Sequence, residues 1–395
     1  MKIAIVIFPI MEPGGINTYL WNLTKAWRKL GHTVDLLHAR EKGYLRNLHP
    51  TKIVLAGRDR RLPGGQFLYG GKHTTTARKL LNTYDLVLFG HQCPHPNIRG
   101  GGSRDWQELY QVKVPIFTVF HDNIWDKAYP WLGEVADAID VCLYTNRSIW
   151  ADSAQRFPRG VFVYTPQLLD TSRAGLYRET KEDKVIWLPQ WKAWKGIKEF
   201  VQALPNIRWP VDLYNSGIEY HYLRKEPIWK KAIGKDEWTK RPVEVSGRGD
   251  HVVRGPAFPA EVRRALSRSN VSVDLTGFKP GPFSGQTTYV HFESMVYGAV
   301  NVLSESVLER PSPIPVDCAI PWDPTTGYRG LASVVNGIMG KPKEQRRIAR
   351  RALSFVTDRF DDGAIAAGIL ALLDSKLPQS DTVVRIKLPK LTESL

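Results

Sequence analysis

The sequence is poor in cysteine and contains no long apolar run. Its 395 residues include three cysteines, Cys93, Cys142 and Cys318, which lie far apart in the chain. This spacing excludes a disulfide framework and favours a protein of the reducing cytoplasm. No segment approaches the roughly 20 consecutive apolar residues of a membrane helix. The first apolar run, residues 2–8, is followed by Glu12 rather than by a cleavage site, so it predicts a buried strand and not a signal peptide.

Acidic residues are also scarce relative to basic ones, and the net charge is +16. Such a charge favours a polyanionic partner, namely nucleic acid, an anionic membrane or an acidic polysaccharide, over a merely basic soluble surface. Residues 40–99 hold eleven Lys and Arg against three acids, and residues 224–268 and 341–351 are basic as well. The last of these predicts a helix with a solvated face. Six residues of the first region are candidates for contacting the polyanion: Arg58, Arg60, Arg61, Lys72, His73 and Arg78.

Short apolar runs alternate with helical patterns through the first half of the chain and again through the second. Uninterrupted apolar runs are typical of strands buried on both faces of a parallel sheet, so each half predicts a doubly wound α/β domain. The runs of the first half are residues 2–8, 33–38, 85–90, 115–120, 140–145 and 161–165. Those of the second half are residues 184–190, 210–217, 243–247, 271–276, 299–304 and 318–322.

The polar segment 165–183 reads as a linker between the two domains. We therefore expect an N-terminal domain over residues 1–168 and a second domain over residues 183–360. Residues 361–395 would form a C-terminal helix and tail, with the option that the helix packs back on the first domain. A cleft is expected between the two domains.

Two motifs favour the binding of an anion. The segment "PGGINTYL" follows the first strand, and Gly14 and Gly15 would let the backbone of a helix N-terminus approach a charged ligand, although a tight turn needs glycine too. The segment "IWLPQWKAWKG", residues 186–196, places Lys192 and Lys195 just after a strand. This pattern is typical of a site for a doubly charged phosphate group.

Three further motifs supply candidate polar groups. "FHDN" brings His121 and Asp122 to the carboxyl end of a strand, where open α/β sheets bind ligands; a packed His with a capping Asp is the alternative. "HQCPH" brings His91 and His95 to the same edge, but no second cluster completes a metal site. Glu293, in a helical stretch from Gln286, would be costly if buried alone, so it should hold hydroxyl groups or a cation.

Together these pieces resemble the GT-B glycosyltransferases, in particular retaining family 4 and, within it, the DNA α-glucosyltransferases of T-even phages. The resemblance rests on the glycine turn, "PQWKAWKG", the helix–strand unit of residues 259–276 and "ESMVYGAVNV" at residues 293–302. It implies two Rossmann-like domains facing a central cleft and a nucleoside-diphosphate sugar as donor, which in the phage enzymes is UDP-linked. The implied acceptor is the hydroxyl of a modified pyrimidine, such as 5-hydroxymethylcytosine, in duplex DNA, within the host cytoplasm if a phage encodes the protein. No metal or other cofactor is implied.

The resemblance also implies roles for individual residues. Lys195, with Lys192 or Gln190, would neutralise the leaving diphosphate, and Gly14 and Gly15 would lie against the donor. Glu293 would bind the donor ribose, and His121 would contact the sugar. Attack from the front face would retain the anomeric configuration, with the leaving phosphate or Asp122 taking the proton. The extruded base would be received near His91 and His95.

The sequence departs from the family pattern at two positions. Gln190 stands where the family has an arginine, and Gly285 stands where it has the first glutamate, eight residues before Glu293. Backbone N–H groups of residues 281–286 could replace that glutamate. Two other functions stay open: a GT-B enzyme that makes cell-surface polysaccharide or lipid-linked glycans, and a non-catalytic nucleic-acid-binding protein on a degenerate transferase scaffold.

Overall fold

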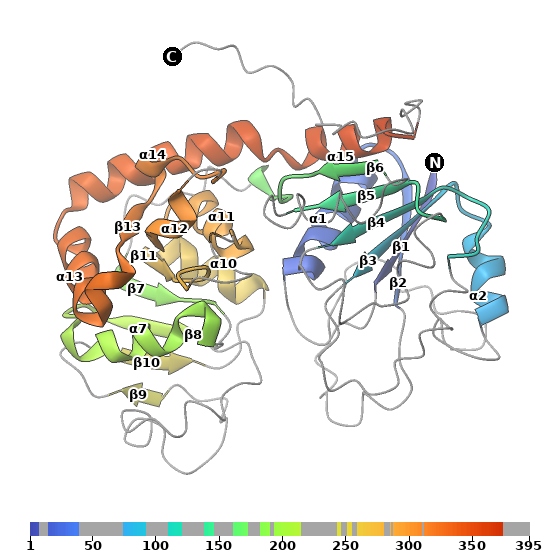
Figure 1. Cartoon of the computed structure of the whole chain (residues 1–395). Helices are drawn as coiled ribbons and strands as arrows, with labels where there is room; N and C mark the ends of the chain where they lie inside the picture. Colours follow the sequence, from blue (N-terminus) through green and yellow to red (C-terminus); the bar gives the residue numbers. More distant parts are fainter. Residues whose placement is uncertain are drawn as a thin grey trace. The chain divides into compact units, whose positions relative to one another are not determined.

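The protein contains two sheets, one of parallel strands and one of parallel strands with a single antiparallel edge strand, and helices pack against each sheet (Figure 1). By internal contacts the chain divides into a first unit, Met1–Leu168 with Asp362–Leu395, and a second unit, Leu169–Asp361. The computed structural model describes residues 1–7, 15–38, 74–91, 110–120, 138–145, 161–172, 182–189, 193–214, 243–245, 251–254, 259–279, 285, 287–309 and 312–373.

The sheet of the first unit has six parallel strands in the order β2-β1-β3-β4-β5-β6. They are β1 (Lys2–Ile7), β2 (Thr33–His38), β3 (Leu86–His91), β4 (Ile116–Phe120), β5 (Val141–Tyr144) and β6 (Val161–Tyr164). All six runs predicted from the first half of the sequence are therefore strands. In the centre, Ile5 pairs with Leu36 on one side and Leu88 on the other, and all three are buried. Because both faces of the sheet are covered, these strands are mostly apolar.

Helix α1 (Gly15–Lys29) follows β1 and confirms the helix predicted there. Its buried side chains Tyr19, Leu20, Leu23 and Trp27 recur every three or four residues, which places them on one face of the helix. Gly31, two residues beyond the end of the helix, has a left-handed φ of 87°. The N–H of Gly31 donates to Arg28 O and that of His32 donates to Trp27 O, which is the hydrogen-bond pattern of a Schellman cap.

The C-terminal helix α15 (Asp362–Ala371) belongs to the first unit and lies beside α1 (Figure 1). Trp27 Nε1 donates a hydrogen bond of 2.9 Å to Ala366 O, and Lys29 lies 3.7 Å from Asp362. The indole of Trp27 is fully buried in this contact, so its N–H needs the partner that α15 provides. A shorter helix, α2 (Thr74–Leu81), precedes β3.

The sheet of the second unit has seven strands in the order β13-β12-β11-β7-β8-β10-β9. They are β7 (Glu182–Trp187), β8 (Val211–Tyr214), β9 (Val243–Val245), β10 (His251–Arg254), β11 (Ser269–Asp274), β12 (Val300–Ser304) and β13 (Ile320–Trp322). The six predicted runs are again strands. Strand β10 escaped prediction because it is four residues long with a basic residue at one end, and the edge strand β9 pairs with it in antiparallel fashion.

The helices of the second unit pack on this sheet around a core in which Trp187 stacks on Phe200 at 4.6 Å between ring centroids. They are α7 (Ile197–Ala203), α10 (Pro259–Arg268), α11 (Tyr289–Val296), α12 (Glu305–Leu308), α13 (Gly327–Met339) and α14 (Pro342–Arg359). Helix α11 begins at Tyr289 and not at Gln286, because Thr288 caps it by accepting from the N–H of His291.

The strand order of the second sheet fixes where a ligand would bind. From β7 the chain adds β8 and β10 on one side, and it then returns to place β11, β12 and β13 on the other. The order therefore reverses between β7 and β11. In open α/β sheets the crevice outside the carboxyl ends of two such strands is the usual ligand site.

Candidate functional site

The turn after β7 is held by the end of β11. Residues Ala193–Lys195 form a single 3₁₀ turn, and Gly196 then opens α7 with a left-handed φ of 77°. A Cβ on Gly196 would lie 2.6 Å from Cβ of Leu275, which is closer than real Cβ atoms come. Glycine is thus required here for both its φ and its size. The requirement explains why a glycine follows Lys195 and fixes the lysine turn against the carboxyl end of β11.

Lys195 is half-buried, and its Nζ lies 4.8 Å from the centre of the neighbouring Trp194 ring. The chain enters this turn from Trp187, whose Nε1 donates to Pro189 O at 2.9 Å. A cation packed on an aromatic face is partly shielded from water, which strengthens its interaction with an anion. Lys195 is therefore suited to bind a phosphate group at this edge of the sheet.

A buried polar cluster ends β11 next to this turn. Asp274 is fully buried, and its Oδ1 accepts from the N–H and the hydroxyl of Thr276 at 2.9 and 2.6 Å. Its Oδ2 accepts from Thr288 Oγ1 at 2.7 Å and lies 3.1 Å from His291 Nε2. Since Thr288 and His291 form the capping box of α11, Asp274 connects β11 to the start of that helix.

Asp274 is also linked to Lys195 through charge. Burial alone would raise the pKa of Asp274, but His291, the charge of Lys195 and the hydrogen bonds from Thr276 outweigh burial and hold this pKa well below its usual range. Asp274 is therefore ionised at neutral pH. Sequence reasoning missed Asp274, Thr288 and His291; the signal was a carboxylate at the last position of an apolar strand.

The loop after β11 is closed by hydrogen bonds to one carbonyl. Gly277 O accepts from the N–H of Gly285 at 3.2 Å and from Ser306 Oγ at 2.8 Å. Gly285 has a left-handed φ of 70°, and a Cβ there would lie 3.1 Å from Ser306 O. The N–H of Gly285 is one of the backbone groups of residues 281–286 that could replace the missing glutamate. It already donates a hydrogen bond within the protein, to Gly277 O.

Glu293 lies in the middle of α11, with only part of its side chain exposed. Burial raises the pKa of its carboxyl to about 7, against a smaller lowering effect of Arg263 on α10. Among the described residues, no side chain donates a hydrogen bond to this carboxylate. An acid in such surroundings is destabilising unless a ligand supplies donors.

Of the remaining predicted site residues, three lie among the described residues and the others do not. Gly15 is the first residue of α1, and the side chain of Arg78 donates to Gln111 Oε1 at 2.6 Å. His91 ends β3, where its backbone pairs with Phe120. The following predicted residues lie outside the described residues: Gly14, Arg58, Arg60, Arg61, Lys72, His73, His95, His121, Asp122, Gln190 and Lys192.

The described ranges lack two features that would point to other functions. These ranges contain no group of three or more His, Cys, Asp or Glu side chains that could hold a metal ion. Nor do those ranges contain a helix that is both long enough and apolar enough to cross a membrane.

No protein-family model and no curated protein sequence matches the chain. Similarity of structure, in contrast, extends over nearly its whole length. An alpha-glucosyltransferase in complex with UDP and a 13-mer DNA containing a HMU base has a TM-score of 0.70 and 14% sequence identity, over 95% of this chain and 100% of that one. The alpha-glucosyltransferase (AGT) in complex with UDP has a TM-score of 0.71 and 15% identity, over 95% and 100%.

A second enzyme, HepE from Anabaena in complex with UDP and glucose, has a TM-score of 0.63 and 14% identity, over 95% of this chain and 99% of that one. Identities this low establish the fold and not the activity. Two Rossmann-like sheets, each with a change of strand order, agree with the architecture that the sequence resemblance implied. The chain therefore has the GT-B fold that it shares with these glycosyltransferases.

Proposed function

We propose that the protein transfers a sugar from a UDP-sugar to the hydroxyl of a modified pyrimidine, such as 5-hydroxymethylcytosine, in duplex DNA, with retention of the anomeric configuration. The observation that carries the proposal is that the second unit of a GT-B fold holds both a half-buried lysine and a partly buried glutamate to which no described side chain donates a hydrogen bond. Lys195 follows β7, next to the change of strand order, and Glu293 lies on α11, which Thr288 ties to the end of β11.

Glu293 supplies the acceptor for the nucleoside part of the donor. Its carboxylate accepts hydrogen bonds from the two ribose hydroxyls, which provide donors where the described side chains provide none. A hydrogen bond to a charged group contributes about 1.5–3 kcal/mol. Binding of the ribose thereby offsets the cost of burying this carboxylate.

Lys195, with Lys192 or Gln190, binds the diphosphate. When the bond between the sugar C1 and the phosphate oxygen breaks, negative charge on the diphosphate increases. A fixed cation therefore stabilises the transition state more than the ground state. Asp274 and Lys195 carry opposite charges that attract each other, and Asp274 holds the adjoining loop through Thr276.

The acceptor hydroxyl attacks C1 from the face that the diphosphate leaves, so the new bond has the configuration of the old one. The hydroxyl proton passes to the leaving phosphate oxygen, with Asp122 as the alternative base. His121 contacts the sugar. This assignment follows the family resemblance.

DNA is the acceptor that the charge favours. The net charge of +16 suits a polyanion, and an alpha-glucosyltransferase of the same fold was crystallised with DNA containing a HMU base. The modified base has to leave the stack to expose its hydroxyl, which costs a few kcal/mol. Contacts from Arg58, Arg60, Arg61, Lys72, His73 and Arg78 to the phosphate backbone offset this cost.

The test is to incubate the protein with duplex DNA containing 5-hydroxymethylcytosine or 5-hydroxymethyluracil and a panel of nucleotide sugars, and then to analyse the nucleosides by mass spectrometry. We expect one hexose added to the modified pyrimidine with UDP-glucose as donor. Unmodified duplex and the Lys195→Ala variant serve as controls. Release of free glucose from UDP-glucose, without any modified nucleoside, would establish donor use and reject the DNA acceptor.

The second candidate is an acceptor of the glycan type, on a surface polysaccharide or a lipid-linked sugar. The similar fold of HepE, which was crystallised with UDP and glucose, favours it. This candidate predicts donor hydrolysis that DNA does not stimulate.

A further inference from the structure

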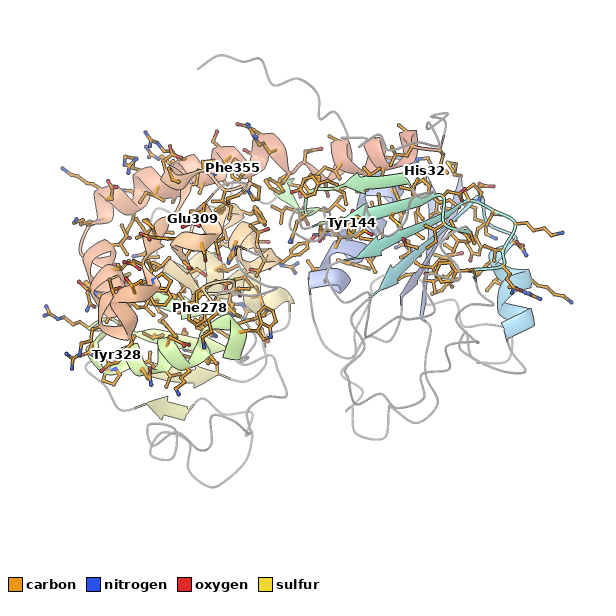
Figure 2. All side chains as sticks on the ribbon, viewed as in Figure 1. His32, Tyr144, Phe278, Glu309, Tyr328 and Phe355 are labelled. Atoms are coloured by element: carbon orange, nitrogen blue, oxygen red, sulfur yellow. The ribbon has the colours of Figure 1, made fainter. Side chains whose placement is uncertain are left out.

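A face of α14 carries five cations that surround one shallow hollow. Among the described residues, those that line this hollow, whose volume is about 380 Å³, are Lys343, Arg346, Arg347, Arg350 and Arg351. They recur at intervals of three or four residues and therefore lie along one side of the helix. We name these five residues the α14 basic face. Figure 2 shows long, nitrogen-tipped side chains on the outer side of α14.

The opposite side of α14 is buried, which fixes the direction of the basic face. Ile348, Ala352 and Val356 are at most 2% exposed, and Phe355 is also buried against the unit. Gln345 Nε2 donates to Ile338 O and Met339 O at 2.9 and 3.0 Å, which ties the first turn of α14 to the end of α13. The five cations thus stand on a rigid support.

Acidic partners are too few to neutralise this face. Arg347 pairs with Glu344, and Arg351 lies 3.0 Å from Asp317. No ion pair of Lys343, Arg346 or Arg350 occurs in the part of the chain that the structure describes. Like charges four residues apart on a helix repel each other and destabilise it. An ordinary solvated helix avoids this cost by alternating the signs of its charges, and this face does not.

We propose that the α14 basic face binds the phosphate backbone of duplex DNA. This inference rests on the proposed function, to which it adds a second region of contact with the acceptor. From residue 343 to residue 351 the helix rises about 12 Å. Along the duplex axis, phosphates of one strand follow each other every 3.4 Å or so, so a stripe of this length spans several phosphates.

A membrane surface fits this face less well. Helices that bind a bilayer insert an apolar side between the lipids, and the apolar side of α14 is buried in the protein. Among the described residues of the second unit, Val316 is the one large hydrophobic side chain that is strongly exposed. The chemistry that remains at this surface is that of guanidinium and ammonium groups, which pair with phosphates.

The experiment compares two triple variants of the full chain. In the test variant, Lys343, Arg346 and Arg350 are changed to alanine; in the control, Arg208, Arg264 and Arg329, three exposed cations elsewhere in the second unit, are changed in the same way. Both lose three positive charges. The affinity for an unmodified duplex is measured by fluorescence anisotropy over a series of salt concentrations, and UDP affinity reports on the integrity of the donor site.

We expect the test variant to bind duplex DNA at least tenfold more weakly at low salt. The slope of log K against log salt should fall in magnitude by about 0.9 for each phosphate contact that is lost. The control should retain the DNA affinity and the salt slope of the unchanged protein to within twofold. Both variants should bind UDP as the unchanged protein does. Equal slopes for test and control would overturn the inference. So would binding to phosphatidylserine vesicles that depends on α14 while binding to DNA does not.

The outcomes also separate this inference from the proposed function. If the unchanged protein glucosylates DNA and the test variant keeps the full salt slope, the proposed function stands and the α14 contact fails. If the protein binds duplex DNA through α14 but modifies no base, the contact stands and the proposed function fails.

Discussion

The two units share one sheet plan but differ in the polar groups that they bury. In the described part of the first unit, two pairs of buried polar side chains hydrogen-bond to each other: Tyr84 donates to Asp35 at 2.9 Å, and Tyr19 lies 3.1 Å from Thr165. In the second unit, Asp274 is surrounded by donors at the carboxyl edge of its sheet and Glu293 has none among the described residues. By our proposal the second unit uses such buried polar groups to bind the donor, which is why function has to be argued from the site and not from the fold.

Charge gives a second comparison. Each unit has a net charge of +8, with 25 Lys and Arg against 17 acids in the first and 30 against 22 in the second. In the first unit the whole excess comes from residues 40–99, because the rest is neutral. In the second, residues 341–351 alone contribute +5. The charge is therefore concentrated in segments of both units, so a DNA-binding surface confined to the first unit would leave half of the excess unexplained.

The largest expected effect tests the reactive site of the second unit. Lys195→Ala should lower the turnover of UDP-glucose by roughly 10²–10³, the usual loss when one well-placed charge is removed from a transition state. Steady-state kinetics would measure it, with circular dichroism to establish that the fold survives. Lys198→Ala, which removes an exposed cation three residues further along, is the matched control and should keep normal turnover. Near-normal turnover in a folded Lys195→Ala protein would remove Lys195 from the site.

The next effect concerns the attachment of the lysine turn to β11. Gly196→Ala would place a Cβ 2.6 Å from that of Leu275 at a left-handed φ, so the free energy of unfolding should fall by about 2–4 kcal/mol. Gly337→Ala is the control, because a Cβ on this glycine in α13 meets nothing within 4 Å. It should stabilise the protein by about 0.5–1 kcal/mol. Urea denaturation measures both, and equal stabilities would contradict the packing described here.

A smaller effect concerns the protonation of Glu293. Its folded pKa of about 7 is above the ordinary value of 4.5, so the stability that protonation provides is fully present below pH 4.5 and is lost as pH rises through 7. Glu293→Gln should remove this loss and be more stable than the unchanged protein at pH 8, by on the order of 2 kcal/mol. Thermal unfolding between pH 5 and pH 8 would measure it, with the exposed Glu309→Gln as control.

The same carboxylate should make UDP binding dependent on pH. Only the ionised form accepts two ribose hydroxyls, so UDP affinity should fall as pH drops below 7, and binding near pH 7 should release a proton. Calorimetry in two buffers of different ionisation enthalpy would detect the proton. An affinity that does not change between pH 6 and pH 8, or that Glu293→Gln leaves unaltered, would place the ribose elsewhere.

Sequence patterns were sufficient for most of the framework. Buried strands covered on both faces are continuous apolar runs, and twelve of the thirteen strands could be recognised in this way. Strand β10 could not, because a four-residue edge-proximal strand with an Arg at one end lacks that signal. Helix α11 was placed three residues early, because the cap formed by Thr288 and His291 is not of the usual Ser/Thr-x-x-Glu type.

The site was predictable only where local spacing carried the information. The pattern of a lysine before a glycine predicts the turn that contains Lys195, because the conformation of such a turn depends on only a few neighbouring residues. The cluster around Asp274 joins residues 274, 276, 288 and 291 and also depends on Lys195. Contacts of that kind arise from the order of strands in the sheet, and one sequence taken alone does not contain that order.

The smallest effect tests the first unit. It should separate the binding of DNA from the binding of UDP. Changing Arg58, Arg60 and Arg61 to alanine removes three of the eleven cations in residues 40–99. If these side chains contact phosphates, the slope of log K against log salt should fall in magnitude by about 0.9 for each contact, and duplex binding should weaken. UDP affinity should not change, because none of these three arginines is among the groups to which we assign the donor. A variant with unaltered salt dependence would leave the α14 basic face as the better candidate for the DNA contact. A variant that loses UDP binding instead would contradict the assignment of these three arginines to DNA and not to the donor.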